Sequence, residues 1–140
     1  FRAQAEYAFS DRFAYTLGGY TGAEGNPATT EVFVATLAIA EARPTTPLPE
    51  PVIFGEAVAV DDWVFVVGGR SQVFGGEAST KVFAAQATDG ALGAWSEVAE
   101  LPMGRTNHEL VLVGDELVVV GGAEAAGGDA TVLVARVRFR

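Results

Sequence analysis

Arginine and tyrosine side chains occupy recurring positions in this sequence, and both residue types suit the recognition of a partner. Tyr20 and Arg70 each follow a pair of glycines directly. Arg2 and Arg105 stand at matching positions of a longer repeat, and Asn107 lies two residues after the second of them. Arginine binds a carboxylate through two parallel hydrogen bonds, while tyrosine stacks and donates a hydrogen bond. These five residues are the candidate binding residues.

The same side chains also have a structural interpretation, and the sequence leaves the choice open. Arg2 and Arg105 can form ion pairs with Glu6, with Glu109 or with a carboxylate of a neighbouring repeat. The chemistry that these residues offer is therefore either binding or stabilisation of the fold.

Catalytic chemistry has little support in this sequence. There is no cysteine, and His108 is the only histidine. We find no nucleophile next to a base, no pair of catalytic carboxylates and no metal-ligating cluster. No catalytic residue, metal or cofactor is therefore expected. His108 is either a ligand or a structural residue, and the structural role is favoured because it is the more common one for a lone histidine.

The glycine pairs mark an internal repeat. Gly18-Gly19, Gly68-Gly69 and Gly121-Gly122 each end an apolar run, and they recur at spacings of 50 and 53 residues. A repeat of this length is one supersecondary unit that packs on its neighbours. The chain therefore divides into three units, of which the third stops before a fourth strand: 1–51, 52–104 and 105–140.

The second unit predicts four antiparallel strands. Alternating residues over 56–60, an apolar run over 63–67 and a Val-Phe segment over 80–87 indicate three strands, and the more polar segment 94–102 indicates a fourth. The run over 63–67 begins at Trp63 and is expected to be buried on both faces. Apolar inner strands with a polar outer strand are typical of a propeller blade. The predicted fold class is all-β, with about three four-stranded antiparallel blades, the third incomplete.

The paired glycines have a structural explanation in such a blade. Glycine lets the backbone of one blade approach the next, and it permits a positive φ where the chain leaves the strand. A phosphate-binding loop would instead need a following helix and usually a lysine, and neither follows Gly69.

Two segments resemble the kelch repeat of β-propellers, in the form of bacterial kelch-like repeats. They read TDGALGAW over 88–95 and LPMGRTNHELVLVGDELVVVGG over 101–122. The resemblance covers essentially the whole chain and is weakest in the first unit, which lacks a counterpart of Trp95. It implies that the residue after each Gly-Gly and the arginine after each Leu-Pro face the rim of a central channel. These positions include Tyr20, Arg70, Arg2 and Arg105.

Enzymes of related architecture need residues that this sequence does not carry. The resemblance extends to kelch-type copper oxidases, which require a cysteine-modified tyrosine and two histidines, against no cysteine and one histidine here. The segment 88–95 is similar to the Asp-box of sialidases, but its Asp, Gly and Trp have the wrong spacing.

The loops after the glycine pairs, 20–31, 70–81 and 123–131, differ most between the units. Variable loops on a repeated scaffold are where binding usually resides. Phe74 lies in the second of these loops and is expected to tuck against its blade, with a partner contact as the alternative.

Composition restricts the partner. The net charge of −9 argues against nucleic acid and against an anionic membrane surface, both of which require a basic footprint. No apolar run approaches the roughly 20 residues of a membrane helix. We therefore expect a protein or a glycan as partner. A secreted, periplasmic or cell-surface location is favoured over a cytoplasmic one, although the absence of cysteine does not identify the compartment.

Closed propellers need roughly 4 to 8 blades, and this chain encodes fewer than three complete ones. It begins without methionine, so we expect a removed or missing segment before Phe1. An open arc leaves an apolar face at each end, so either the remaining blades lie in a longer chain or copies associate. The predicted function is a non-catalytic module that binds a protein or glycan through its rim loops, within a larger ring or assembly.

Two alternatives remain open from the sequence. One is part of a propeller enzyme, an oxidase or a glycan-active enzyme, whose active residues lie outside this chain. The other is a subunit of a filament or surface assembly.

Overall fold

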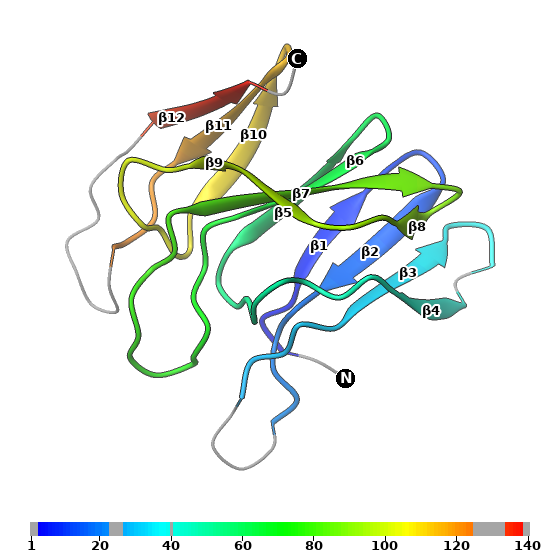
Figure 1. The fold of residues 1–140 in the computed structure, drawn as a ribbon, viewed down its shortest axis with the longest axis horizontal. Coiled ribbons are helices and arrows are strands. Elements are labelled where there is room, and N and C mark those ends of the chain that lie inside the picture. The colour runs from blue at the N-terminus through cyan, green and yellow to red at the C-terminus, as the bar shows by residue number, and fades with distance from the viewer. Residues whose placement is uncertain (1–2, 23–26, 40, 125–133, 139–140) are drawn as a thin grey trace.

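The computed structural model describes residues 3–22, 27–39, 41–124 and 134–138, the last without side chains. These residues form twelve β-strands and no helix, and hence none that could cross a membrane. The strands form three antiparallel sheets that lie one after another along the chain (Figure 1). The prediction of an all-β, blade-like architecture is confirmed, and the sheets are called blades 1, 2 and 3 below.

The strands of each blade follow one another in sequence and in space. Blade 1 has the order β1-β2-β3-β4, with the bounds Glu6–Phe9, Phe13–Leu17, Val32–Thr36 and Ala42–Thr45. Blade 2 contains β5 (Glu56–Val60), β6 (Trp63–Val67), β7 (Lys81–Thr88) and the outer β9 (Ser96–Glu100). Blade 3 contains β10 (Glu109–Val113), β11 (Glu116–Val120) and β12 (Val134–Arg138), so three strands of it are described.

Blade 2 departs from the predicted pattern at its outer edge. The segment between the expected strands 80–87 and 94–102 contains a fifth short strand, β8 (Ala91–Leu92), which pairs with the end of β7. The pairing of β7 with β9 shifts register between Val82 and Phe83. The outer edge of β7 therefore pairs with β9 in its first half and with β8 at its end.

The apolar side chains of β6 pack against both neighbouring blades, because successive side chains of a strand point to opposite faces of the sheet. Val64 and Val66 belong to the core shared with blade 1, whereas Phe65 and Val67 belong to the core shared with blade 3. Burial on both faces is thus confirmed for these four residues. Trp63 was expected to be buried with them, and this was wrong. It begins the strand beside a turn and is 38% exposed.

Paired glycines end β2, β6 and β11, as predicted, and all six have positive φ. Gly18 and Gly68 lie directly against the carbonyl oxygens of Val52 and Arg105 in the following blade, so a Cβ at either glycine would collide with backbone. The next amide in each pair donates to the same carbonyl, Gly19 to Val52 at 2.9 Å and Gly69 to Arg105 at 2.7 Å. Close approach of blade to blade is therefore what these positions require.

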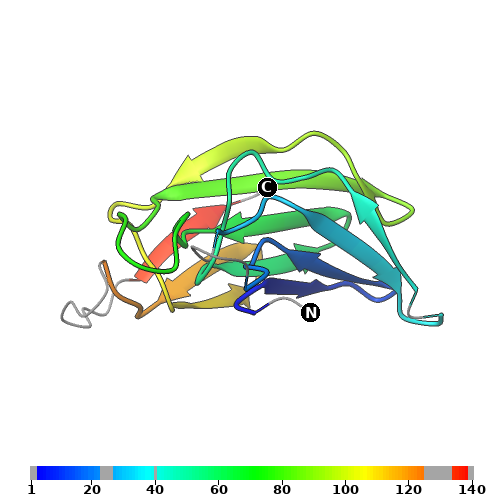
Figure 2. The same cartoon turned by 90° about the horizontal axis from the view of Figure 1, so that it is seen from below.

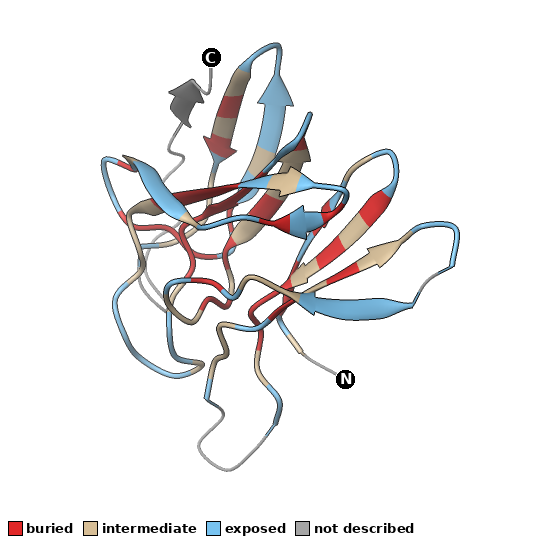
Figure 3. Ribbon diagram, turned by 45° about the vertical axis from the view of Figure 1, so that its right-hand side comes forward, coloured by how far each residue is buried: buried red, intermediate tan, exposed pale blue. Residues whose placement is uncertain are grey.

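Each blade has two ends with different structures. The glycine end is where β2, β6 and β11 finish at Gly-Gly, and the hairpin end carries the tight turns 10–12, 61–62 and 114–115. Figure 2 shows the blades from below, stacked at an angle to one another. Figure 3 shows the buried residues along the inner strands, while β4 and β10 are mainly exposed.

Candidate functional site

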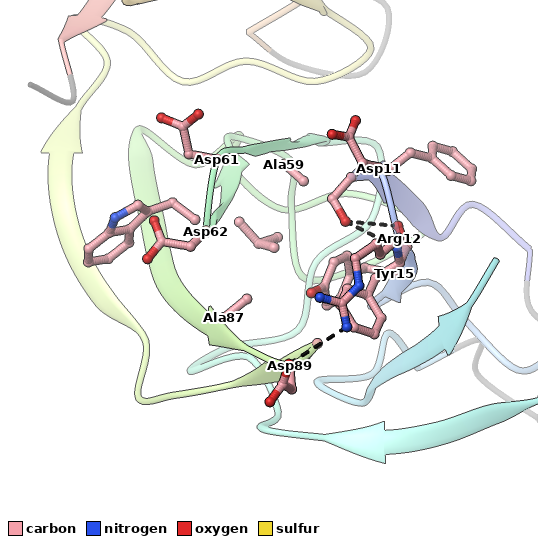
Figure 4. Close-up of a pocket in the computed structure, with 14 residues that line it drawn as sticks. Asp11, Arg12, Tyr15, Ala59, Asp61, Asp62, Ala87 and Asp89 are labelled. Atoms are coloured by element: carbon pink, nitrogen blue, oxygen red, sulfur yellow. Dashed lines mark hydrogen bonds and ion pairs between the residues drawn. The ribbon is translucent and has the colours of Figure 1, made fainter. Parts of the chain in front are cut away.

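A cleft of about 460 Å³ opens at the hairpin end, between blades 1 and 2 (Figure 4). Three turns form its rim: the β1-β2 turn, the β5-β6 turn and the β7-β8 turn. Their rim residues are Ser10, Asp11, Arg12, Asp61, Asp62, Trp63, Asp89 and Gly90. In the close-up, Asp11 and Arg12 lie on one side, Asp61 and Asp62 on the other, and Asp89 below them.

Short polar side chains make these turns tight. In the β1-β2 turn, the Phe13 amide donates to Ser10 Oγ at 3.1 Å, and the Ser10 amide donates to the Phe13 carbonyl at 2.9 Å. The β5-β6 turn has two residues, since Val60 pairs with Trp63, and Asp61 adopts a φ of 52°. Aspartate is one of the few non-glycine residues that tolerate this left-handed conformation.

The wall and floor of the cleft are packed by apolar groups. The ring of Phe13 lies against Gly90, and any side chain at Gly90 would collide with that ring. Ala59 and Ala87 are small and leave the space between the two blades open. Tyr15 is buried on the blade 1 side, and this burial raises the pKa of its phenol, with Arg43 opposing the shift.

The rim of the cleft is acidic. Arg12 Nη2 lies 3.7 Å from a carboxylate oxygen of Asp89, and the Arg12 guanidinium stacks over the ring of Phe13. Gln86 Nε2 donates to Asp62 at 2.7 Å. Exposed pairs of this kind contribute little to stability. One arginine thus faces four aspartates, and the rim carries excess negative charge.

These groups are suited to recognition. Carboxylates accept hydrogen bonds from hydroxyl groups and attract cations, and the exposed indole of Trp63 offers a flat apolar surface. Within the described residues, no group of three or more histidine, aspartate and glutamate side chains is arranged to hold a metal ion.

A second cleft, of about 510 Å³, lies at the glycine end beside the loop that follows Gly68-Gly69. Arg70 lines it, together with Glu50 and Lys81, whose side chains form an ion pair at 2.6 Å. Its wall thus carries charges of both signs, in contrast to the acidic rim of the hairpin end.

The structure brings two of the predicted binding residues together around Phe54. The Arg70 guanidinium stacks on the Phe54 ring with 4.7 Å to its centroid, and its Nη2 donates to the Val73 carbonyl at 2.6 Å. The exposed Asn107 donates its backbone amide to the Phe54 carbonyl at 2.8 Å. Tyr20 is half-buried in blade 1. Arg70 thus holds its own loop in place while lining the cleft.

The other two predicted residues have different outcomes. Arg105 is 1% exposed, and its Nη2 lies 2.9 Å from Met103 Sδ. Among the described residues, no ion pair joins Arg105 to Glu109 or to another carboxylate, so the expected pairing is absent there. Its burial favours the structural interpretation. Arg2 lies outside the described residues.

Sequence reasoning considered Glu6 and Glu109 only as ion-pair partners and missed that they belong, with Glu56, to a recurring set at the glycine end. Glu6, Glu56 and Glu109 each begin the first strand of a blade. Glu6 is buried and accepts a hydrogen bond from the Gly55 amide at 2.9 Å. Burial raises the pKa of Glu6 to about 8, with the Gly55 amide opposing and Glu56 adding to the shift. The repeat spacing could have found them, since they recur in the frame of the glycine pairs.

His108 is buried, in agreement with its structural interpretation. Burial lowers the pKa of its imidazole to about 4, which the Val67 backbone opposes and Arg105 reinforces. Its ring occupies the junction of blades 2 and 3, against Gly68.

The expectation for Phe74 was wrong. Its side chain is 79% exposed and does not tuck against the blade. The chain turns immediately after it through Gly75 and Gly76, both with positive φ, and this turn carries the loop away from the sheet.

Comparison with known proteins leaves the family open. No protein-family model matches this chain, and no curated protein matches it. The resemblance to kelch repeats therefore stays a prediction.

Proposed function

We propose that the chain is a non-catalytic binding module that holds a protein or glycan partner, as part of a larger ring or assembly. The observation that carries the proposal is the acidic cleft at the hairpin end of blades 1 and 2. It combines exposed carboxylates from three turns with an exposed tryptophan.

The chemistry of the cleft favours a partner with hydroxyl or cationic groups. A sugar ring presents hydroxyls to carboxylates and an apolar face to an indole. A lysine or arginine of a protein partner would use the same carboxylates and stack on Trp63. An anionic partner would be repelled by Asp11, Asp61 and Asp62.

The loops of the glycine end offer a second binding surface. Phe74 stands exposed at one of them, and Arg70 lines the adjacent cleft. Variable loops on a repeated scaffold are where binding usually resides.

Binding to two probes tests the proposal: an array of immobilised neutral oligosaccharides and a display library of basic peptides. We expect the chain to bind members of one of them. Trp63→Ala should weaken that binding by about 1–2 kcal/mol, because a flat aromatic anchor is lost. Phe74→Ala is the matched control, since it removes an exposed aromatic residue at the opposite end.

The outcomes separate the possible sites. Loss of binding in Trp63→Ala and not in Phe74→Ala supports the cleft. Loss of binding in Phe74→Ala and not in Trp63→Ala assigns binding to the loops of the glycine end and overturns the role of the cleft. Failure of the folded chain to bind either probe overturns the binding module itself.

A further inference from the structure

The two junctions inside the chain follow one rule. Tyr15 and Leu17 of β2 pack toward blade 2, and Phe65 and Val67 occupy the equivalent places of β6 toward blade 3. At the glycine end of each junction, a carbonyl of the following blade fills the space above the first glycine and accepts the amide of the second. Each blade thus has a face that receives the next blade.

Among the described residues, nothing covers the corresponding receiving face of blade 3. Val118 and Val120 occupy the places of Phe65 and Val67, and Val111 and Val113 lie on the same face of β10. Val111, Val113 and Val120 are 46%, 57% and 38% exposed. These four residues are called the valine face.

The glycine pair beside the valine face is also open. Gly121 has a φ of 71°, like Gly18 and Gly68, yet no atom lies within 4 Å of a Cβ placed on it. Gly121 therefore has the conformation of the other two without the carbonyl that they receive. The receiving geometry is present, and its occupant is missing from the described residues.

Blade 1 presents the opposite kind of face. Tyr7 and Phe9 lie on one side of β1 and are 53% and 62% exposed. Ala14 and Thr16 of β2 pair with them and share that side. These four residues are called the aromatic face. The places of Tyr7 and Phe9 are taken by Ala57 and Ala59 in blade 2, which pack against blade 1.

The two uncovered faces are complementary in size. In the junction of blades 1 and 2, the large Tyr15 faces small alanines. On the two exposed faces the side-chain sizes are exchanged. The valine face, which would receive the next blade, has the smaller side chains, and the aromatic face has Tyr7 and Phe9. Closely packed interfaces require such matching of volumes.

We propose that the valine face of one copy binds the aromatic face of a second copy, head to tail, and that two such junctions close a ring of two chains. The three sheets described in each of two copies make six, within the range of roughly 4 to 8 blades that closed propellers use. A head-to-tail contact closes into a ring only when the rotation permits it, and the blades within one chain are already inclined to one another (Figure 2). The inference is independent of the binding proposed for the cleft.

Mass in solution, measured by sedimentation, is the first test. The chain should have twice its mass of 14.6 kDa. Val111→Glu with Val113→Glu, on the valine face, should give a folded monomer, and so should Tyr7→Glu with Phe9→Glu on the aromatic face. Ile39→Glu is the control, because Ile39 is an apolar residue in the β3-β4 turn that is 74% exposed and lies on neither face. It should leave the dimer intact.

A mixture of the two double variants distinguishes head-to-tail contact from other dimers. Each variant keeps one intact face, and these faces are complementary. The mixture should therefore form a heterodimer through a single junction, although each variant alone is monomeric. If one face instead paired with its own copy, the variant that keeps that face would remain a homodimer by itself, and the mixture would contain no heterodimer.

Gly121→Ala tests the geometry with the smallest change. A methyl group there meets open space in the single chain, so the monomer should still fold. In the ring it would strike the incoming carbonyl, so the dimer should dissociate. A wild-type chain that stays monomeric up to its solubility limit, a mass above two copies, or an unchanged dimer in Gly121→Ala would each overturn the proposal.

Discussion

An acidic side chain is buried at the glycine end of blades 1 and 2, whereas acidic side chains are exposed at their hairpin end. At the glycine end, Glu6 is buried in the junction, bonded to the Gly55 amide, with its pKa raised to about 8. At the hairpin end, Asp11, Asp61 and Asp62 are exposed around an open cleft. The same strands therefore run from a closed end that stabilises the stack of blades to an open end that is available for binding.

The difference comes from the distance between the backbones of consecutive blades at each end. At the glycine end, Gly18 and Gly68 bring consecutive blades into hydrogen-bond contact. At the hairpin end, the turns 10–12 and 61–62 carry charged side chains at the mouth of the cleft, and charged groups keep their water. Changes at the two ends should therefore have effects of very different size.

The largest effect is expected for Gly68→Ala. The added Cβ would lie 2.6 Å from the Arg105 carbonyl oxygen, at a φ of 62° that alanine disfavours. We expect a loss of about 3 kcal/mol or more in the free energy of unfolding, since neither backbone can move without opening the junction. Urea denaturation would measure it.

Gly114→Ala provides the control at the hairpin end. Gly114 has nearly the same φ, 63°, and nothing within 4 Å. Only the conformational cost of about 1 kcal/mol should appear there. Equal losses of unfolding free energy in Gly68→Ala and Gly114→Ala would show that the positive φ, and not the close approach of the next blade, makes Gly68 intolerant of substitution.

A second effect should appear in the dependence of stability on pH. The pKa of Glu6 is about 8 in the folded chain against 4.5 for an ordinary glutamate, so the folded state binds its proton more tightly than the unfolded state. Stability therefore falls as pH rises between these two values. Above pH 6.5, His108 is neutral in the folded state and mostly neutral in the unfolded state, so it opposes the trend by less than about 0.5 kcal/mol. Glu6 alone should cost about 2 kcal/mol between pH 6.5 and 8.

Glu6→Gln should abolish most of that loss. Its amide oxygen can still accept the hydrogen bond from Gly55, and it has no proton to release. Thermal unfolding at pH 6.5 and 8 would compare the variant with the parent chain. A parent chain that is equally stable at both values would contradict the buried, protonated state of Glu6.

The smallest effect is expected for Asp62→Asn at the hairpin end. Asp62 is exposed and its side chain bonds to Gln86, so the free energy of unfolding should change by no more than about 0.5 kcal/mol. Chemical denaturation checks this, while binding to the probe that the chain recognises should weaken. A large loss of stability would assign Asp62 to the fold and remove it from the candidate site.

The sequence by itself determined the strands, the three units and the role of the glycine pairs. Alternation over 56–60 and the apolar run over 63–67 are local patterns, and they correctly predicted β5 and β6. The recurrence of Gly-Gly predicted the close approach of successive blades, because only glycine, which has no Cβ, fits at these positions. Counting strands along the chain also predicted fewer than four strands in the third blade, of which three are described.

Tertiary structure alone decided where the candidate site lies and which charges are buried. The cleft needs the β1-β2, β5-β6 and β7-β8 turns to converge, and no local pattern reports how turns from two units meet. Arg70 and Arg105 look alike in sequence, yet Arg70 lines a cleft while Arg105 is enclosed. The physical reason is that burial depends on the packing of one blade against the next, which the residue type and its local sequence do not report.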